Sequence, residues 1–198
     1  MSTLTLPDGS TKMLPEGEPV GGVVPKGTLA ARVDGVLRDL SFVPQGDVSV
    51  IPVGANDEDG LHVLRHSTAH VLAQAVCDVF PGAKYAIGPA IADGFYYDFA
   101  LPDAIAAADL QKIDRRMRQI IKSNQPFVRE EVSRQAALER LADQPFKLEI
   151  IEGLEEAADE IGAGDTVSIY RNGDWADLCL GPHVPSTGKL GVFKVTNL

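Results

Sequence analysis

The chain contains 198 residues, 44% of them hydrophobic, and carries a formal net charge of −10 at pH 7. This acidic balance argues against a general nucleic-acid coat protein, although basic residues gather between positions 115 and 140. No apolar run approaches the roughly 20 residues of a membrane span, and the first residues lack the layout of a secretory signal. Two cysteines far apart in the sequence do not make a disulfide framework, so we expect a reduced, cytoplasmic protein with no membrane partner.

Residues 1–54 have the pattern of a small β-rich unit. Alternating residues bounded by turn sequences predict strands over 2–6, 11–14, 29–33, 36–40 and 48–53. Asp34-Gly35 is a strong signal for a two-residue hairpin turn. The segment 16–27 is rich in Gly and Pro, and it predicts a short helix at best. The polar, acidic stretch 55–60 predicts a linker.

The rest of the chain mixes helical and strand patterns. Helices are predicted over 61–80, 104–123 and 134–142. Ser133 is the expected N-cap of the third helix. Strands are predicted over 127–132, 146–151 and 166–170, with two more between 85 and 99 joined around residues 92–94.

Two short motifs contain three of the four histidines. His66 and His70 are four residues apart, so both rings project from one face of the predicted helix. Cys179 and His183 have the same spacing. A histidine pair of this kind is by itself more often structural, and the second motif is what favours function. Three imidazoles and a thiol can either bind zinc or activate a water molecule.

The order of these motifs resembles the editing domain of bacterial threonyl-tRNA synthetase. The matching stretches are His66–His70, Ile87–Pro89, Gly94–Asp98, Pro145–Leu148, Asp177–Cys179 and Gly181–Pro185. Residues 1–54 resemble the ubiquitin-like TGS domain of the same family, most clearly at Leu4–Gly9. The resemblance implies an α+β fold: a small ubiquitin-like β-grasp domain at 1–54, and at 61–198 a larger α/β-sandwich editing domain with an antiparallel sheet and packed helices.

The resemblance also implies a reaction, the deacylation of serine attached to the acceptor end of threonine tRNA. His66 or His70 is expected to take a proton from the attacking water, with His66 preferred. Lys147 is expected to stabilise the oxyanion or to hold the ribose hydroxyl. Asp177 is expected to bind the substrate's ammonium group or to orient a histidine, and an alternative is that it only caps a turn. A plain surface position is the alternative for Lys147.

Further residues are expected to shape the pocket. Cys179 and His183 would position the substrate or share in proton transfer. Gly88 would let backbone amides approach the seryl group, and Tyr97 would stack on the terminal adenine. Tyr96 and Tyr97 point to opposite faces of a regular strand, so one of them is expected in the core. We expect His62 to be exposed, and Cys77 and Trp175 to serve packing.

Several features depart from the family pattern. Leu180 stands where Arg is common, the stretch 152–166 is shorter than usual, and most of the helix expected in the first domain is missing. The class II core and the anticodon-binding domain would follow residue 198, so these 198 residues alone are not expected to activate threonine or to charge tRNA. ATP and zinc are expected only in that core, and the rest of the synthetase is an expected partner on the same chain.

Three functions therefore remain open. The first is editing without a required cofactor, favoured by Asp177 and by the Gly-Pro pair before His183. The second is a zinc-dependent deacylase acting in trans, because alanyl-tRNA editing domains share both motifs and hold zinc there. The third is a non-catalytic module that binds tRNA or protein.

Overall fold

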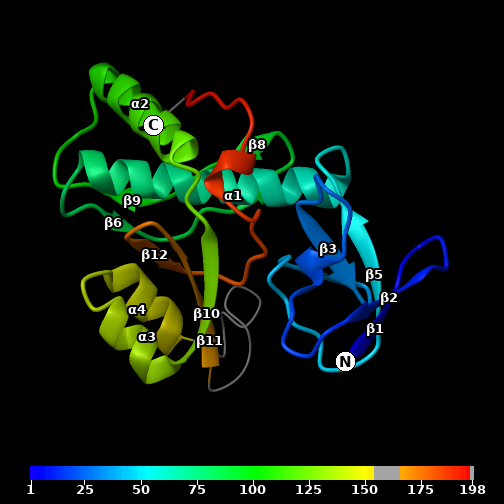
Figure 1. Cartoon of the computed structure of the whole chain (residues 1–198). Helices are drawn as coiled ribbons and strands as arrows, with labels where there is room; N and C mark the ends of the chain where they lie inside the picture. The colour runs from blue at the N-terminus through cyan, green and yellow to red at the C-terminus, as the bar shows by residue number, and fades with distance from the viewer. Residues whose placement is uncertain (154–165, 197–198) are drawn as a thin grey trace. The chain divides into compact units, whose positions relative to one another are not determined.

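The computed structural model describes residues 1–153 and 166–196, and their contacts divide the chain into two compact units (Figure 1). The first unit comprises residues 1–64 together with 181–185, and the second comprises the described parts of 65–180 and 186–198. Both units combine helices with largely antiparallel sheets, which confirms the predicted mixture of helix and sheet. Among the described helices, none is long and apolar enough to cross a membrane.

The first unit is built on a five-stranded sheet with the order β2-β1-β5-β3-β4. Its strands are β1 (Ser2–Thr5), β2 (Thr11–Leu14), β3 (Ala30–Val33), β4 (Val36–Arg38) and β5 (Val48–Val53). All five predicted strands are confirmed, three of them slightly shorter than expected. β1 and β5 run parallel, and the other neighbours are antiparallel. Leu4, Val20 and Val50 are fully buried in the core of this unit.

Turns complete the first unit. Asp34 and Gly35 both have positive φ, 47° and 83°, as the predicted hairpin turn between β3 and β4 requires. The Gly- and Pro-rich segment contains only the single 3-10 turn η1 (Val20–Gly22), in agreement with the prediction of a short helix at best.

The long helix α1 (Glu58–Val79) begins three residues earlier than predicted. Glu58 and Asp59 lie in its first turn, where acidic side chains favour the positive end of the helix. Asp59 also forms an ion pair with Arg32 of β3, with 2.6 Å between Oδ2 and Nε. This contact joins the first turns of α1 to the first unit, so the contact division falls inside the helix and not at the predicted linker.

The second unit is organised around the antiparallel sheet β10-β11-β12. Its strands are β10 (Phe127–Ser133), β11 (Thr166–Asn172) and β12 (Trp175–Leu178). The other elements are α2 (Ala107–Lys122), α3 (Arg134–Arg140), the 3-10 turn η2 (Thr187–Lys189), and the short pairs β6 (Lys84–Tyr85) with β9 (Phe99–Ala100) and β7 (Ala90–Ile91) with β8 (Gly94–Phe95). Ser133 caps α3 as predicted, because its Oγ accepts the Ala136 N–H.

The prediction of a strand at 146–151 is wrong, because these residues belong to helix α4 (Pro145–Glu152). A proline in the first turn suits a helix start, where its missing N–H costs nothing. α4 lies beside α3 (Figure 1). Ile151 is buried in one hydrophobic cluster with Ala137, Leu141 and Leu178. Most of the stretch 152–166, which we expected to be shorter than usual, lies outside the described residues.

Candidate functional site

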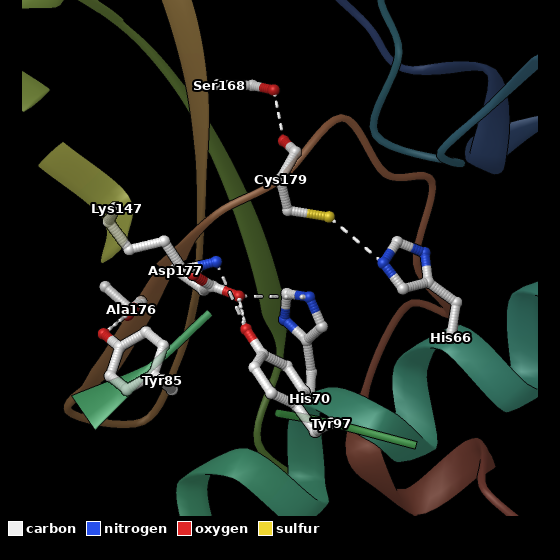
Figure 2. Close-up of polar contacts among 9 residues, drawn as sticks. All are labelled: His66, His70, Tyr85, Tyr97, Lys147, Ser168, Ala176, Asp177 and Cys179. Atoms are coloured by element: carbon white, nitrogen blue, oxygen red, sulfur yellow. Dashed lines mark hydrogen bonds and ion pairs between the residues drawn. The ribbon is translucent and has the colours of Figure 1, made fainter. Parts of the chain in front are cut away.

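A buried carboxylate on β12 is the centre of a polar cluster in the second unit. Asp177 forms an ion pair with Lys147 of α4, with 2.7 Å between Oδ1 and Nζ, and each side chain is only 2% exposed. The Tyr97 hydroxyl donates a hydrogen bond to Asp177 Oδ2 (Figure 2). His70 Nε2 of α1 lies 3.7 Å from the same oxygen. Three segments that are distant in sequence therefore converge on one carboxylate.

Burial sets the protonation states in this cluster. It raises the pKa of the Asp177 carboxyl, and the Lys147 ammonium works in the opposite direction. Burial, together with the charge of Asp177, raises the pKa of the Tyr97 hydroxyl well above its usual value, so this hydroxyl stays a donor. The pKa of His70 is held well below its usual value, first by burial and then by the neighbouring His66 and Lys147. His70 is therefore a neutral imidazole at pH 7.

A thiol and an imidazole meet next to this cluster. Cys179 Sγ lies 3.2 Å from His66 Nε2 (Figure 2). The rings of His66 and His70 are nearly perpendicular, with 5.1 Å between their centroids, as expected for neighbours on one helix face. The backbone of Cys179 is held by Ser168 of β11, whose carbonyl accepts the Cys179 N–H at 3.1 Å and whose hydroxyl donates to the Cys179 carbonyl.

The donor atoms of His66, His70 and Cys179 all lie within 4.8 Å of one another. Two imidazole nitrogens and one sulfur form a donor set of the kind that zinc prefers, and two of the three residues are buried. The set therefore fits a metal chemically. The same atoms also suit proton transfer, since His66 is only half-buried and can reach solvent.

The fourth predicted donor, His183, belongs to the first unit. It lies in the segment 181–185, its side chain is buried, and its backbone N–H donates to Asp39 Oδ1 at 2.8 Å. The exposed side chain of Leu180 precedes this segment.

The structure gives Gly88 and Tyr97 a shared packing role. A Cβ atom on Gly88 would lie 2.0 Å from Cδ2 of the Tyr97 ring, so only glycine fits there. The Tyr97 ring stacks on Phe99 with 5.2 Å between centroids and is 8% exposed, whereas Tyr96 is 42% exposed. This confirms that one of the two tyrosines lies in the core. Stacking of Tyr97 on an adenine stays a prediction.

Lys147 is not a surface lysine, and the alternative of an ordinary exposed side chain is wrong. Its ammonium group lies 5.5 Å from the centre of the Tyr85 ring and 5.7 Å from that of Tyr97. Tyr85, which sequence reasoning did not select, also donates from its hydroxyl to the Ala176 carbonyl at 2.8 Å. No local pattern marks it, since an aromatic residue in a short strand is a common core position.

Other predicted positions agree with the structure in part. The Trp175 ring packs near the site, with its centroid 5.4 Å from that of His70. His62 is exposed, as predicted. Cys77, for which we expected a buried packing role, is only half-buried.

Comparison with known proteins relates the chain to aminoacyl-tRNA synthetases. Residues 167–197 match the model of the threonyl and alanyl tRNA synthetase second additional domain. A threonine–tRNA ligase of Acidithiobacillus ferrooxidans is 44% identical over 98% of this chain and 31% of its own length. The ligases of Rubrobacter xylanophilus (43%, covering 100% of this chain and 31% of the relative) and Mycolicibacterium vanbaalenii (50%, covering 82% and 26%) are also similar. The chain thus spans less than a third of the length of these curated relatives.

Proposed function

We propose that this chain, related in sequence to the threonyl-tRNA synthetase family, is a module that hydrolyses serine from mischarged threonine tRNA. In this proposal residues 1–54 form a TGS-like β-grasp domain and residues 61–198 form the editing domain. Its partners are the acceptor end of the tRNA and the rest of a cytoplasmic synthetase, to which aminoacylation with ATP and zinc belongs.

The need for such a module follows from the limits of binding selectivity. Serine lacks one methyl group of threonine, and a difference of this size gives only about 1–3 kcal/mol of discrimination. A second site that cleaves the wrong ester corrects the remaining errors. The observation that carries the proposal is that the donor atoms of His66, His70 and Cys179 lie within 4.8 Å of one another, and that His70 also lies 3.7 Å from the Asp177 carboxylate, which is paired with Lys147.

His66 is the proposed general base. It is more accessible than His70, and the low pKa of His70 makes that buried imidazole a weak proton acceptor. In the reaction the water oxygen attacks the ester carbonyl carbon and its proton passes to His66. The bond to the ribose oxygen then breaks, and that oxygen takes up a proton, which leaves free serine and free tRNA.

The buried cluster supports the charged steps. Lys147 is the proposed stabiliser of the oxyanion or holder of the ribose hydroxyl, since its ammonium is oriented by Asp177 and is shielded from water. The carboxylate of Asp177 already has Lys147 and Tyr97 as partners, which favours an orienting role over binding of the ammonium group. Cys179 and His183 are proposed to position the substrate or to share in proton transfer, and Gly88 to shape the pocket wall.

A zinc-dependent deacylase is the second candidate, favoured by the sulfur and two nitrogens within 4.8 Å. His66, His70 and Cys179 would hold the ion, which when bound supplies a Lewis acid and lowers the pKa of a coordinated water. In that case His66 would be a ligand and could not serve as the base.

The test compares the release of labelled serine from seryl-tRNA with that of threonine from threonyl-tRNA. We expect faster cleavage of the seryl ester, and we expect His66→Ala to slow it about 10²–10⁴-fold. His62→Ala, an exposed position on the same helix, is the matched control and should keep the full rate. Retention of the full rate by His66→Ala would refute the base assignment.

Two further outcomes separate the alternatives. Loss of activity with a chelator, and its return with zinc, would favour the metal-dependent enzyme. Absence of cleavage by the unmodified protein would leave only a binding module.

A further inference from the structure

We propose that Asp39 is a positioning residue that fixes the segment carrying His183, a residue to which the proposed function gives a part in the reaction. The consequence for turnover rests on the proposed function. The positional claim does not, because Asp39 and residues 181–185 belong to the same compact unit.

The contact itself is specific. Asp39 Oδ1 accepts the backbone N–H of His183 at 2.8 Å, across 144 positions in the sequence. The segment 181–185 contains neither helix nor strand, yet His183 and Val184 are 1% and 0% exposed. A buried irregular backbone needs partners for its polar groups, and a carboxylate makes a stronger bond to an N–H than a neutral acceptor does.

Asp39 lies in a hydrogen-bonded turn that directly follows β4. Its carbonyl accepts the Phe42 N–H at 3.1 Å. The same turn is tied to η1, since the Leu40 carbonyl accepts the Gly21 N–H at 2.8 Å. A Cβ on Gly21 would lie only 2.8 Å from that carbonyl oxygen, so glycine is required for this close approach.

The chain on both sides of the segment is held elsewhere. Cys179 donates its N–H to Ser168, and Thr187 donates to Gln125, all within the second unit. Within the first unit, the Asp39 carboxylate orients the peptide from which the His183 imidazole projects. Small errors in the position of a catalytic group are costly, since a displacement of about 1 Å can slow a reaction about a hundredfold.

The experiment uses the full chain with three variants. Asp39→Ala removes the acceptor, whereas Asp39→Asn keeps an oxygen that can accept the same N–H. Asp47→Ala is the matched control, because Asp47 Oδ1 also accepts a backbone N–H in the first unit, that of Thr3 at 2.6 Å. For seryl-tRNA we expect Asp39→Ala to lower kcat about tenfold or more with little change in KM. The other two variants should stay near the unmodified rate.

A second readout is independent of activity. The chain has only four histidines, so their imidazole nitrogen NMR signals can be assigned with His→Gln variants. We expect Asp39→Ala to shift the His183 signals and to leave those of His62 unchanged, with no such shift for Asp39→Asn or Asp47→Ala. Shifted signals in a protein without deacylase activity would support the positioning role and refute the proposed function.

Unchanged His183 signals together with an unchanged rate in folded Asp39→Ala would overturn the proposal. If that variant does not fold, hydrogen exchange of the unmodified protein tests whether the His183 amide is hydrogen-bonded. The His183 amide should be strongly protected despite lying outside any helix or strand. Rapid exchange at this amide would overturn the proposal as well.

Discussion

Lys147 of α4 and Asp177 of β12 form an ion pair of 2.7 Å from which solvent is almost completely excluded. The rings of Tyr85 and Tyr97 flank the ammonium group, and the Tyr97 hydroxyl contacts the carboxylate. Charges buried in this way are costly unless each has a partner, so neither residue can be removed alone without a penalty. The same two residues therefore contribute to the stability of the second unit and to the proposed reaction.

Replacing Lys147 by Met should destabilise the protein by about 3–5 kcal/mol, because it leaves the Asp177 carboxylate buried without its cation. Urea unfolding at pH 7 measures this loss. Lys112→Met is the control, since Lys112 pairs with Asp109 at 2.8 Å on the surface and such pairs contribute about 1 kcal/mol or less. Equal effects of the two substitutions would contradict the structural importance of the buried pair.

The low pKa of His70 predicts a pH-dependent stability. In the unfolded chain His70 takes up a proton as the pH falls below its ordinary pKa of 6.5, whereas in the folded protein it stays neutral to a lower pH. The free energy of unfolding should therefore fall as the pH is lowered below 6.5. The raised pKa of Asp177 acts with the opposite sign, since its contribution is lost as the pH rises through the folded-state pKa.

Urea titrations in chelator at pH 7.5, 6.5 and 5.5 would measure this effect. His70→Gln should show a flatter dependence than the unmodified protein, because the glutamine does not titrate. His62→Gln, at an exposed position, should keep the original slope. A slope that is the same in His70→Gln and the unmodified protein would show that His70 is not the group responsible.

The helices and turns that could be predicted are those whose signal lies in residues that are close together in the sequence. Periodicity predicted α1 with His66 and His70 on one face, and Asp34-Gly35 predicted a hairpin turn, because neighbouring residues determine both. The alternation of apolar and polar residues at 146–151 suggested a strand, but these residues form α4, whose Ile151 is buried in one cluster with Ala137 and Leu178. The inward direction of Lys147 depends on Asp177, a partner that no local pattern identifies.

Substituting Gly88 by Ala should damage both stability and the site, since the new methyl group would overlap the Tyr97 ring. Overpacking of this kind costs about 1–3 kcal/mol, and displacement of Tyr97 would move its hydroxyl from Asp177. Thermal unfolding and the deacylation rate are the two measurements. Gly94→Ala is the control, because a Cβ there meets no atom within 4 Å. Wild-type behaviour of Gly88→Ala would mean that the ring has room to move.

Cys77 should be a poorly reactive thiol, because burial raises its pKa to about 11. In a Cys179→Ser background, alkylation by iodoacetamide at pH 8 should be about two hundredfold slower than that of a free cysteine with a pKa of about 8.5, because the thiolate fraction is that much smaller. The rate should rise about tenfold per pH unit up to pH 10, because each unit increases the thiolate fraction tenfold while the pH stays below the pKa. Unfolding in urea should restore ordinary reactivity, which shows that the fold suppresses it. A rate that levels off between pH 9 and pH 10 would instead mean that the half-buried thiol ionises like a free cysteine.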